Sequence, residues 1–220
     1  MKLVPDHLLI AAPDLDAGIR FSEEKLGVRP VPGGSHPGQG TRNALLGLED
    51  DIYIEIIAPD PAQPPDLPLA SYLRSLDTPA LSWWCARCDD LVALKRQLGA
   101  EGINSGPIDP WSRTLPDGSS LRWHLLMPGD SPFGALLPFC INWEDMTRHP
   151  SRQLPTVGRL ESLVIRHPAV GEFPASIDDS VSLESGGPPA MTATLQIADR
   201  SVILDSGDEL PTAIGAIAGY

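Results

Sequence analysis

The hydrophobic and polar positions of this chain repeat a strand-then-helix pattern. An apolar run over residues 3–12 predicts a strand, which ends in an acidic turn that leads into an amphipathic helix. A similar run over residues 80–87 precedes a second amphipathic helix over residues 90–98. Glycines follow both helices, at Gly27 and Gly99, and glycine is the residue most often found just after a helix. The pattern predicts two copies of one supersecondary unit.

Further extended segments complete each copy. The predicted strands cover residues 41–48 and 51–58 in the first copy, and residues near 113, 121–127 and 136–143 in the second. The first copy also contains a glycine- and proline-rich passage over residues 30–40, and five prolines over residues 59–68 form a linker, because proline cannot continue a sheet. We therefore expect a first βαβββ module at residues 1–60 and a second at residues 78–150.

A shorter third copy follows at residues 158–206. Residues 162–168 repeat the apolar pattern of residues 7–13, and residues 190–197 with 201–205 predict a hairpin. This segment is either a partial module or a cover for an exposed sheet edge. The predicted fold class is α+β: paired βαβββ modules that form a curved mixed sheet around a cavity, plus a shortened third β-rich module at the C-terminus, together one compact domain.

Composition and charge narrow the classes of partner. The chain has 220 residues, of which 42% are hydrophobic and 20% charged, as is ordinary for a globular protein. A net charge of -13 disfavours nucleic acid and anionic membranes, which attract basic surfaces. No apolar run reaches the length of a membrane span. We expect a cytoplasmic monomer or homodimer whose partner is a small organic molecule, with no nucleic-acid or membrane partner.

Three cysteines, Cys85, Cys88 and Cys140, are too few for a disulfide framework and fit a reducing compartment. Cys85 and Cys88 match a C-x-x-C spacing, but they lie along a predicted strand, where residues three apart point to opposite faces. A zinc knuckle would also need a second ligand pair. The sequence therefore favours structural thiols.

Four short motifs, in this order, carry a resemblance to a known family. They are Asp6-His7, the passage Gly33-Gly34-Ser35-His36-Pro37-Gly38-Gln39-Gly40-Thr41-Arg42-Asn43, Tyr53-Ile54-Glu55, and Pro138-Phe139-Cys140-Ile141-Asn142-Trp143 with His149-Pro150. With the paired modules, they resemble glyoxalase-like domain proteins of the vicinal oxygen chelate superfamily. That superfamily includes glyoxalase I, extradiol dioxygenases, fosfomycin-resistance enzymes and bleomycin-binding proteins.

The resemblance implies a divalent metal in a cavity between the modules, held by residues on the first and last strands of each. The metal would be Zn, Mn, Ni, Fe or Mg, and it would act as a Lewis acid on substrate oxygens. In the first module, His7 and Glu55 occupy the ligand positions. Tyr53 shares strand parity with Glu55 and should flank the same site.

The second module departs from the family pattern. Trp83 lies seven residues before Asp90, as His7 lies seven before Asp14, so an indole stands where a histidine ligand is expected. Alignment of the last strands places Asn142 opposite Glu55, where an amide oxygen is at best a weak third ligand. A weak site, a remodelled site or no metal site is compatible with this pattern.

Other polar and aromatic residues are candidates for the cavity. His36 is either a general base on a loop over the cavity or a solvated loop histidine. Thr41 and Asn43 share one face of their strand and would line a pocket if that face points inward. Three tryptophans, together with Phe139, either wall an aromatic cavity or belong to the core: Trp83, Trp123 and Trp143.

Two classes of function follow. The first is a metal-dependent isomerase, lyase or hydrolase in which His7 and Glu55 hold the metal, a water or Asn142 completes its shell, and Glu55 or His36 moves a proton. The second is a metal-free protein that binds or sequesters a small molecule, as bleomycin-binding relatives do. The intact pair of His7 and Glu55 favours the enzyme, and Trp83 favours the binding protein.

Overall fold

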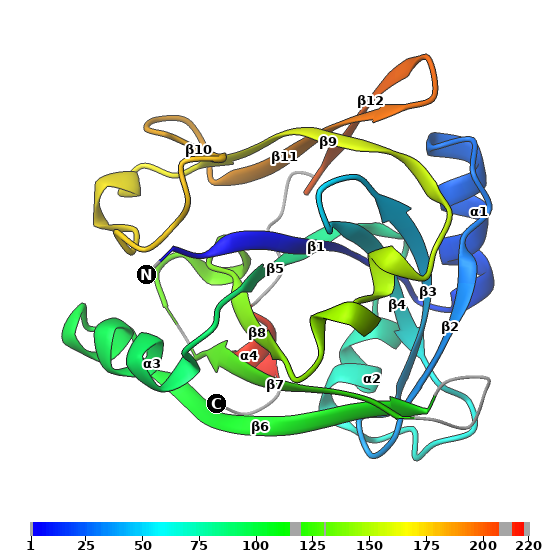
Figure 1. Ribbon diagram of the computed structural model, residues 1–220, viewed down its shortest axis with the longest axis horizontal. Helices are drawn as coiled ribbons and strands as arrows, with labels where there is room; N and C mark the ends of the chain where they lie inside the picture. The colour runs from blue at the N-terminus through cyan, green and yellow to red at the C-terminus, as the bar shows by residue number, and fades with distance from the viewer. Residues whose placement is uncertain (1, 115–119, 130, 207–212, 218–220) are drawn as a thin grey trace.

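The computed structural model describes residues 2–114, 120–129, 131–206 and 213–217. A strongly curved sheet runs through them, and its concave side encloses α2 and α4 (Figure 1). The first repeat consists of β1 (Val4–Ala11), α1 (Leu15–Lys25), β2 (Val31–His36), β3 (Thr41–Leu48) and β4 (Tyr53–Pro59). The second consists of β5 (Ala80–Arg87), α3 (Leu91–Ala100), β6 (Ser105–Thr114), β7 (Ser120–Pro128) and β8 (Phe139–Trp143).

The remaining elements connect the repeats or extend the sheet. They are α2 (Pro68–Arg74), β9 (Thr156–Arg166), β10 (Val181–Glu184), β11 (Ala190–Ile197), β12 (Arg200–Asp205), α4 (Ile214–Ile217) and short 3-10 turns at Gly134–Leu136, Met146–Arg148, Pro150–Arg152 and Val170–Glu172. None of the helices in the described ranges is both long and apolar enough to cross a membrane.

Sequence patterning explains the helices. Asp14 and Asp90 each accept a hydrogen bond from the backbone N–H three residues later, at Ala17 and Ala93, and so cap α1 and α3. After α1, Gly27 has a φ of 74°, a left-handed conformation that glycine adopts without strain. In the second copy, Gly99 lies within α3, and Gly102, with a φ of 79°, follows the helix instead. The shared aspartate caps therefore begin the same unit twice.

The sheet order is β12-β11-β9-β3-β4-β1-β5-β8-β7-β6. In addition, β2 pairs with β3, and β10 pairs with β9. β1 and β5 lie antiparallel at the centre, where His7 pairs with Cys85 and Leu9 pairs with Trp83. β9 joins the sheet through a short parallel pairing with β3, and the third segment thus continues the sheet. The curved mixed sheet and α+β class predicted from the repeat are confirmed.

The connections contain two elements that the sequence pattern alone did not assign. The passage rich in glycine and proline includes a strand, β2, which pairs with β3; only that side of the strand is paired, so prolines are tolerated. The proline-rich linker leads directly into α2, which has Pro68 at its first position, where the missing N–H of proline removes no helical hydrogen bond. In consequence α2 lies against the cavity and contributes Leu69 to its wall.

The two faces of the sheet carry separate cores. The larger apolar cluster contains Leu26 of α1 and Leu94 of α3, so these helices cover one face. The second cluster contains Leu73 of α2, Ile214 of α4 and Trp83 of β5 on the other face. Odd-numbered residues of β1, β3, β4, β7 and β8 face this second side, and strand alternation gathers the site residues there.

Candidate functional site

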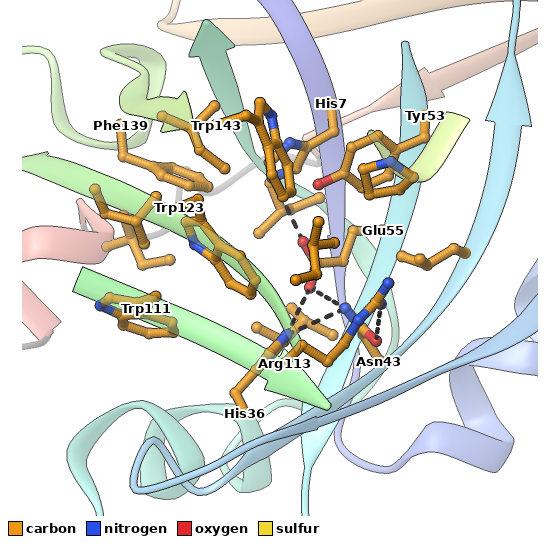
Figure 2. Close-up of a pocket in the computed structure, with 18 of the residues that line it drawn as sticks. His7, His36, Asn43, Tyr53, Glu55, Trp111, Arg113, Trp123, Phe139 and Trp143 are labelled. Atoms are coloured by element: carbon orange, nitrogen blue, oxygen red, sulfur yellow. Dashed lines mark hydrogen bonds and ion pairs between the residues drawn. The ribbon is translucent and has the colours of Figure 1, made fainter. Parts of the chain in front are cut away.

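A cavity opens on the concave side of the sheet. It encloses about 570 Å³ of space not filled by protein atoms, its open mouth included. Its polar lining residues are His7, His36, Asn43, Tyr53, Glu55 and Arg113, and its aromatic wall consists of Trp111, Trp123, Phe139 and Trp143. Figure 2 shows the polar residues gathered around Glu55, with the aromatic rings beside them. A few polar groups in an apolar cavity are typical of a small-molecule site.

Glu55 of β4 lies at the centre of the polar group (Figure 2). Asn43 Nδ2 donates a hydrogen bond of 2.8 Å to Glu55 Oε1. His36 Nε2 lies 3.8 Å from the same oxygen, and His7 Nε2 lies 3.4 Å from Oε2. Only 7% of Glu55 is exposed to solvent, so its charge depends on these neighbours.

Asp6 orients His7 from behind. Asp6 Oδ1 lies 2.7 Å from His7 Nδ1, and because an ionised carboxylate only accepts hydrogen bonds, Nδ1 carries the proton. In neutral His7, Nε2 then presents a lone pair to Glu55. This is the arrangement by which a second carboxylate orients a histidine that binds a metal.

The other oxygen of Asp6 accepts further hydrogen bonds. Trp143 Nε1 and His149 Nε2 lie 3.1 and 3.2 Å from Asp6 Oδ2, and Arg87 Nη1 lies 3.4 Å away. Burial alone would raise the pKa of Asp6, but the hydrogen bonds from His149 and His7, and the charges of these rings, hold that pKa well below its usual value. Asp6 is therefore an anion at neutral pH and anchors three strands and the turn after β8.

His36 is a buried cavity residue, 5% exposed, and not a solvated loop residue. Its Nδ1 lies 2.9 Å from Thr41 Oγ1, and Asn43 Nδ2 lies 3.2 Å from its Nε2. Gln63 donates a hydrogen bond to the His36 carbonyl oxygen and fixes this part of the chain. Burial lowers the pKa of His36 below its usual value, although the charge of Glu55 opposes the shift, and His36 is neutral near pH 7.

The geometry of His7 and Glu55 fits a divalent ion. Two ligand atoms bound tetrahedrally at about 2.1 Å lie about 3.4 Å apart. His7 Nε2 and Glu55 Oε2 are separated by 3.4 Å, and a lone pair facing a carboxylate oxygen at that distance calls for a proton or a cation between them. Imidazole nitrogen and carboxylate oxygen together suit Zn, Mn, Ni and Fe better than Mg, which prefers oxygen ligands.

A second group with metal-ligand side chains overlaps this pair. One ligand atom each of Asp6, His7 and Cys85 lies within 4.8 Å of the others. However, Asp6 already accepts hydrogen bonds on both oxygens, and burial, followed by the charge of Asp6, raises the pKa of the Cys85 thiol well above its usual value. Because the thiolate is the form that binds metal, this set is the poorer fit. All three cysteines are buried, and none of them forms a disulfide.

The register of the sheet corrects the expected role of Asn142. Leu9 of β1 pairs with Glu55, and Cys85, which occupies the position of Leu9 in the second repeat, pairs with Phe139. Phe139, and not Asn142, is therefore the counterpart of Glu55. Asn142 Nδ2 instead donates to the carbonyl oxygens of Cys88 and Asp89, and Asn142 is not among the residues that line the cavity.

Trp83 and Thr41 lie just outside the cavity lining. In the pairing of β1 with β5, His7 lies opposite Cys85 and Trp83 lies opposite Leu9. His7 and Trp83 therefore occupy equivalent positions in the two repeats, as the spacing before the helix caps predicted. The Trp83 ring packs 5.7 Å from the ring of Tyr72, on α2. Thr41 is fully buried behind His36, which it supports. By contrast, the cavity lining includes Asn43, Tyr53, Trp123 and Trp143, and the Tyr53 ring stacks on His7 at 4.4 Å.

The structure adds three polar residues to the expected set. Asp6 and His149 form the buried support of His7, and Arg113 of β6 lines the cavity next to Asn43 (Figure 2). Asp6 could have been inferred from its place beside His7 in the motif. Arg113 shares strand parity with Trp111, but its face could be assigned only after β6 had been placed.

A family model described as a glyoxalase-like domain matches residues 6–178. None of the curated proteins compared with the chain matches it. A hypothetical protein from Staphylococcus aureus has a similar structure, with a TM-score of 0.62 and 18% identity over 92% of this chain and 85% of that one. The methylmalonyl-CoA epimerase from Mycobacterium tuberculosis gives a TM-score of 0.42 and 26% identity over 64% of this chain and 88% of that one.

Proposed function

Because this chain belongs to the glyoxalase-like domain family of the vicinal oxygen chelate superfamily, we propose that its cavity carries out a metal-dependent reaction on a small organic molecule. The reaction is an isomerisation, a lyase reaction or a hydrolysis that includes a proton transfer. The observation that carries this proposal is the pair of His7 Nε2 and Glu55 Oε2, which lie 3.4 Å apart in a buried cavity.

His7 and Glu55 would hold the ion, and Asp6 would position His7 through Nδ1. A divalent ion bound there supplies a Lewis acid that polarises a substrate oxygen. Asn43 donates to Glu55 Oε1, which leaves Oε2 as the oxygen that faces His7. The fixed orientation of both side chains means that neither has to reorganise when the site is filled.

Two groups can accept a substrate proton. His36 Nε2 and Glu55 Oε1 lie 3.8 Å apart and face the same cavity. A substrate C–H group bound beside them would therefore be within reach of either atom after a small movement. Trp111 and Trp123 pack at 6.1 and 6.4 Å from the His36 ring and exclude water from it. Exclusion of water strengthens the electrostatic interactions of a charged transition state.

A metal-free binding protein is the second candidate. It is favoured by the ligand positions of the second repeat, where Trp83 and Phe139 are the counterparts of His7 and Glu55. Neither side chain can bind a metal, and Phe139 adds an apolar ring to the cavity wall in place of a ligand. The cavity would then sequester an apolar molecule by burial alone.

Hydrogen exchange with solvent distinguishes the two candidates. Protein stripped with a chelator and then reloaded with Zn²⁺ or Mn²⁺ is incubated in D₂O with a panel of small 2-oxo acids, hydroxy ketones and thioesters, and proton NMR follows each carbon-bound hydrogen. We expect metal-dependent exchange of one acidic C–H, abolished by Glu55→Gln and slowed by His36→Gln. Panel members that bind but never exchange, with or without metal, would support the binding protein instead.

A further inference from the structure

One buried guanidinium lies at the side of this cavity. Arg113 is 6% exposed and lines the cavity two residues after Trp111. Its Nη1 donates a hydrogen bond of 3.4 Å to Asn43 Oδ1, and its buried Nε has no hydrogen-bond partner among the described residues. None of the ion pairs found in the described ranges of the chain includes Arg113.

The residues that the structure describes supply Arg113 with little direct compensation for this burial. Asn43 Oδ1, which is neutral, also accepts a hydrogen bond of 2.9 Å from the backbone N–H of Gly34. Arginine cannot discharge itself by losing a proton, and a buried charge without a partner is unfavourable. An anionic ligand in the cavity would supply such a partner.

The backbone of β2 is shaped around this side chain. A Cβ at Gly33 would clash with Asn43 Oδ1 and would lie 2.8 Å from Arg113 Nη1, so glycine is needed for this close approach. Gly34, the next residue, donates to Asn43. The guanidinium of Arg113, on β6, therefore lies directly against β2 and β3.

We infer that the ligand of this cavity is a small monocarboxylic acid with an aromatic or branched apolar body, and that Arg113 binds its carboxylate. The inference extends the proposed function by naming the class of substrate. A guanidinium offers a planar fork of N–H donors that matches the two oxygens of a carboxylate. Among the described residues that line the cavity, Arg113 is the one permanent cation, which balances one negative charge and not the two of a phosphate ester.

Neighbouring residues define the rest of the ligand. Trp111 pairs with Trp123 across β6 and β7, and Leu121 lies opposite Arg113, so an apolar surface begins directly beside the guanidinium. Both ring nitrogens of His36 lie against side chains of the protein itself, Nδ1 at 2.9 Å from Thr41 Oγ1 and Nε2 at 3.2 Å from Asn43 Nδ2. A ligand with its charge at one end and a ring at the other matches this division.

Paired acids and amides test the inference. Binding of phenylacetate and 3-phenylpropionate is measured by calorimetry and tryptophan fluorescence in chelator-treated protein, beside phenylacetamide and 3-phenylpropionamide, which have the same shape without the charge. Metal is removed so that the carboxylate cannot bind an ion. We expect the acids to bind about 10- to 100-fold more tightly than the amides.

Variants locate the charge effect. Arg113→Met should abolish the preference for acid, Arg113→Lys should keep part of it, and Arg122→Met, an exposed arginine on β7, should leave it unchanged. Equal affinity for acid and amide in the parent protein, no binding of either, or a preference that survives in Arg113→Met would overturn the inference. If Arg113→Met does not fold, loss of the preference in Arg113→Gln, or its persistence there, decides in the same way.

The outcome is independent of the proposed reaction. Selective acid binding by metal-free protein supports the ligand class even if no hydrogen exchange is found. Exchange of a neutral panel member without acid preference would support the reaction and remove the role of Arg113. The two failures therefore give different results.

Discussion

Asp6 Oδ1 lies 2.7 Å from His7 Nδ1, although these residues are neighbours on one strand. Successive side chains of a regular strand point to opposite faces and do not meet in this way. The pairing of β1 with β5 shifts register between Pro5 and His7. Such a bulge redirects a side chain, and here it brings the carboxylate of Asp6 behind the imidazole that faces Glu55.

Replacement of Asp6 by asparagine should lower both stability and metal affinity. The change removes the negative partner of His7, His149 and Arg87 from a fully buried position, and loss of one partner of a buried pair costs about 3–5 kcal/mol. Loss of a group that orients a metal ligand weakens binding about 10- to 100-fold. Urea unfolding in the presence of chelator and ion titration measure the two effects separately.

Asp51→Asn is the matched control for this change. Asp51 pairs with Arg152 at 2.7 Å on the protein surface, and an exposed pair contributes about 0–1 kcal/mol. Asp51 has a φ of 55°, which asparagine also tolerates. Equal losses of stability in the two variants would show that the Asp6 network is not a special support of the site.

Glu55→Gln should weaken ion binding while leaving the metal-free protein as stable or more stable. Glutamine can accept the hydrogen bond from Asn43 through its oxygen and donate an N–H to the His7 lone pair, so the unfavourable contact of two acceptors is relieved. Thermal unfolding with chelator present is the measurement. A large loss of stability there would make Glu55 a structural hydrogen-bond partner and not a metal ligand.

Trp83→Ala should lower stability by about 3–5 kcal/mol, the cost of removing a large buried aromatic side chain. Since Trp83 packs on Tyr72 and is not part of the cavity lining, ion affinity and the affinity for phenylacetate should not change in the folded fraction. Trp143→Phe, which changes the lining and removes the hydrogen bond to Asp6, is the comparison. Loss of ligand affinity in Trp83→Ala without loss of stability would place Trp83 in the binding site.

The cysteines should be unreactive in the folded protein. Burial, followed by nearby negative charges, raises the pKa of the Cys85 thiol well above its usual value, and burial also raises the pKa of Cys88 and Cys140. Moving from about pH 7 to pH 9, where ordinary thiols ionise, should therefore release much less thiolate from the folded protein than from the unfolded chain. Thiol titration with a disulfide reagent checks this prediction. Rapid reaction of Cys85 in the native protein would contradict it and would make Cys85 a candidate metal ligand again.

The repeat made much of the fold predictable, because helix caps and strand parity are local. Asp14 and Asp90 mark equivalent points in both copies, and counting back from them identified Trp83 as the counterpart of His7, which agrees with the pairing of His7 with Cys85 and of Leu9 with Trp83. The same method failed at the last strand. The sequence alignment of the last strands placed Asn142 opposite Glu55. In the structure, a 3-10 turn at Gly134–Leu136 precedes β8, and the pairing of Cys85 with Phe139 makes Phe139 the counterpart of Glu55.

The candidate site was predictable where one strand determines which face a residue occupies. Glu55 and Tyr53 follow from the parity of β4, and their presence in the cavity lining agrees with that expectation. Arg113 and His149 depend on how distant strands curve together, over sequence separations of 70 residues from Asn43 and 143 from Asp6. Strand parity along a single segment carries no information about such contacts.

Ion titration of chelator-treated protein tests the central claim most directly. Calorimetry with Zn²⁺ and with Mn²⁺ should show a single ion bound per chain by the parent protein. Glu55→Gln and His7→Gln should each weaken this binding by about tenfold or more, because each removes one ligand atom of the pair. Asn142→Ala, whose side chain bonds to Cys88 and Asp89 away from the cavity, should bind as the parent does. Absence of binding in the parent, or binding that persists unchanged in both Glu55→Gln and His7→Gln, would contradict a metal site at His7 and Glu55.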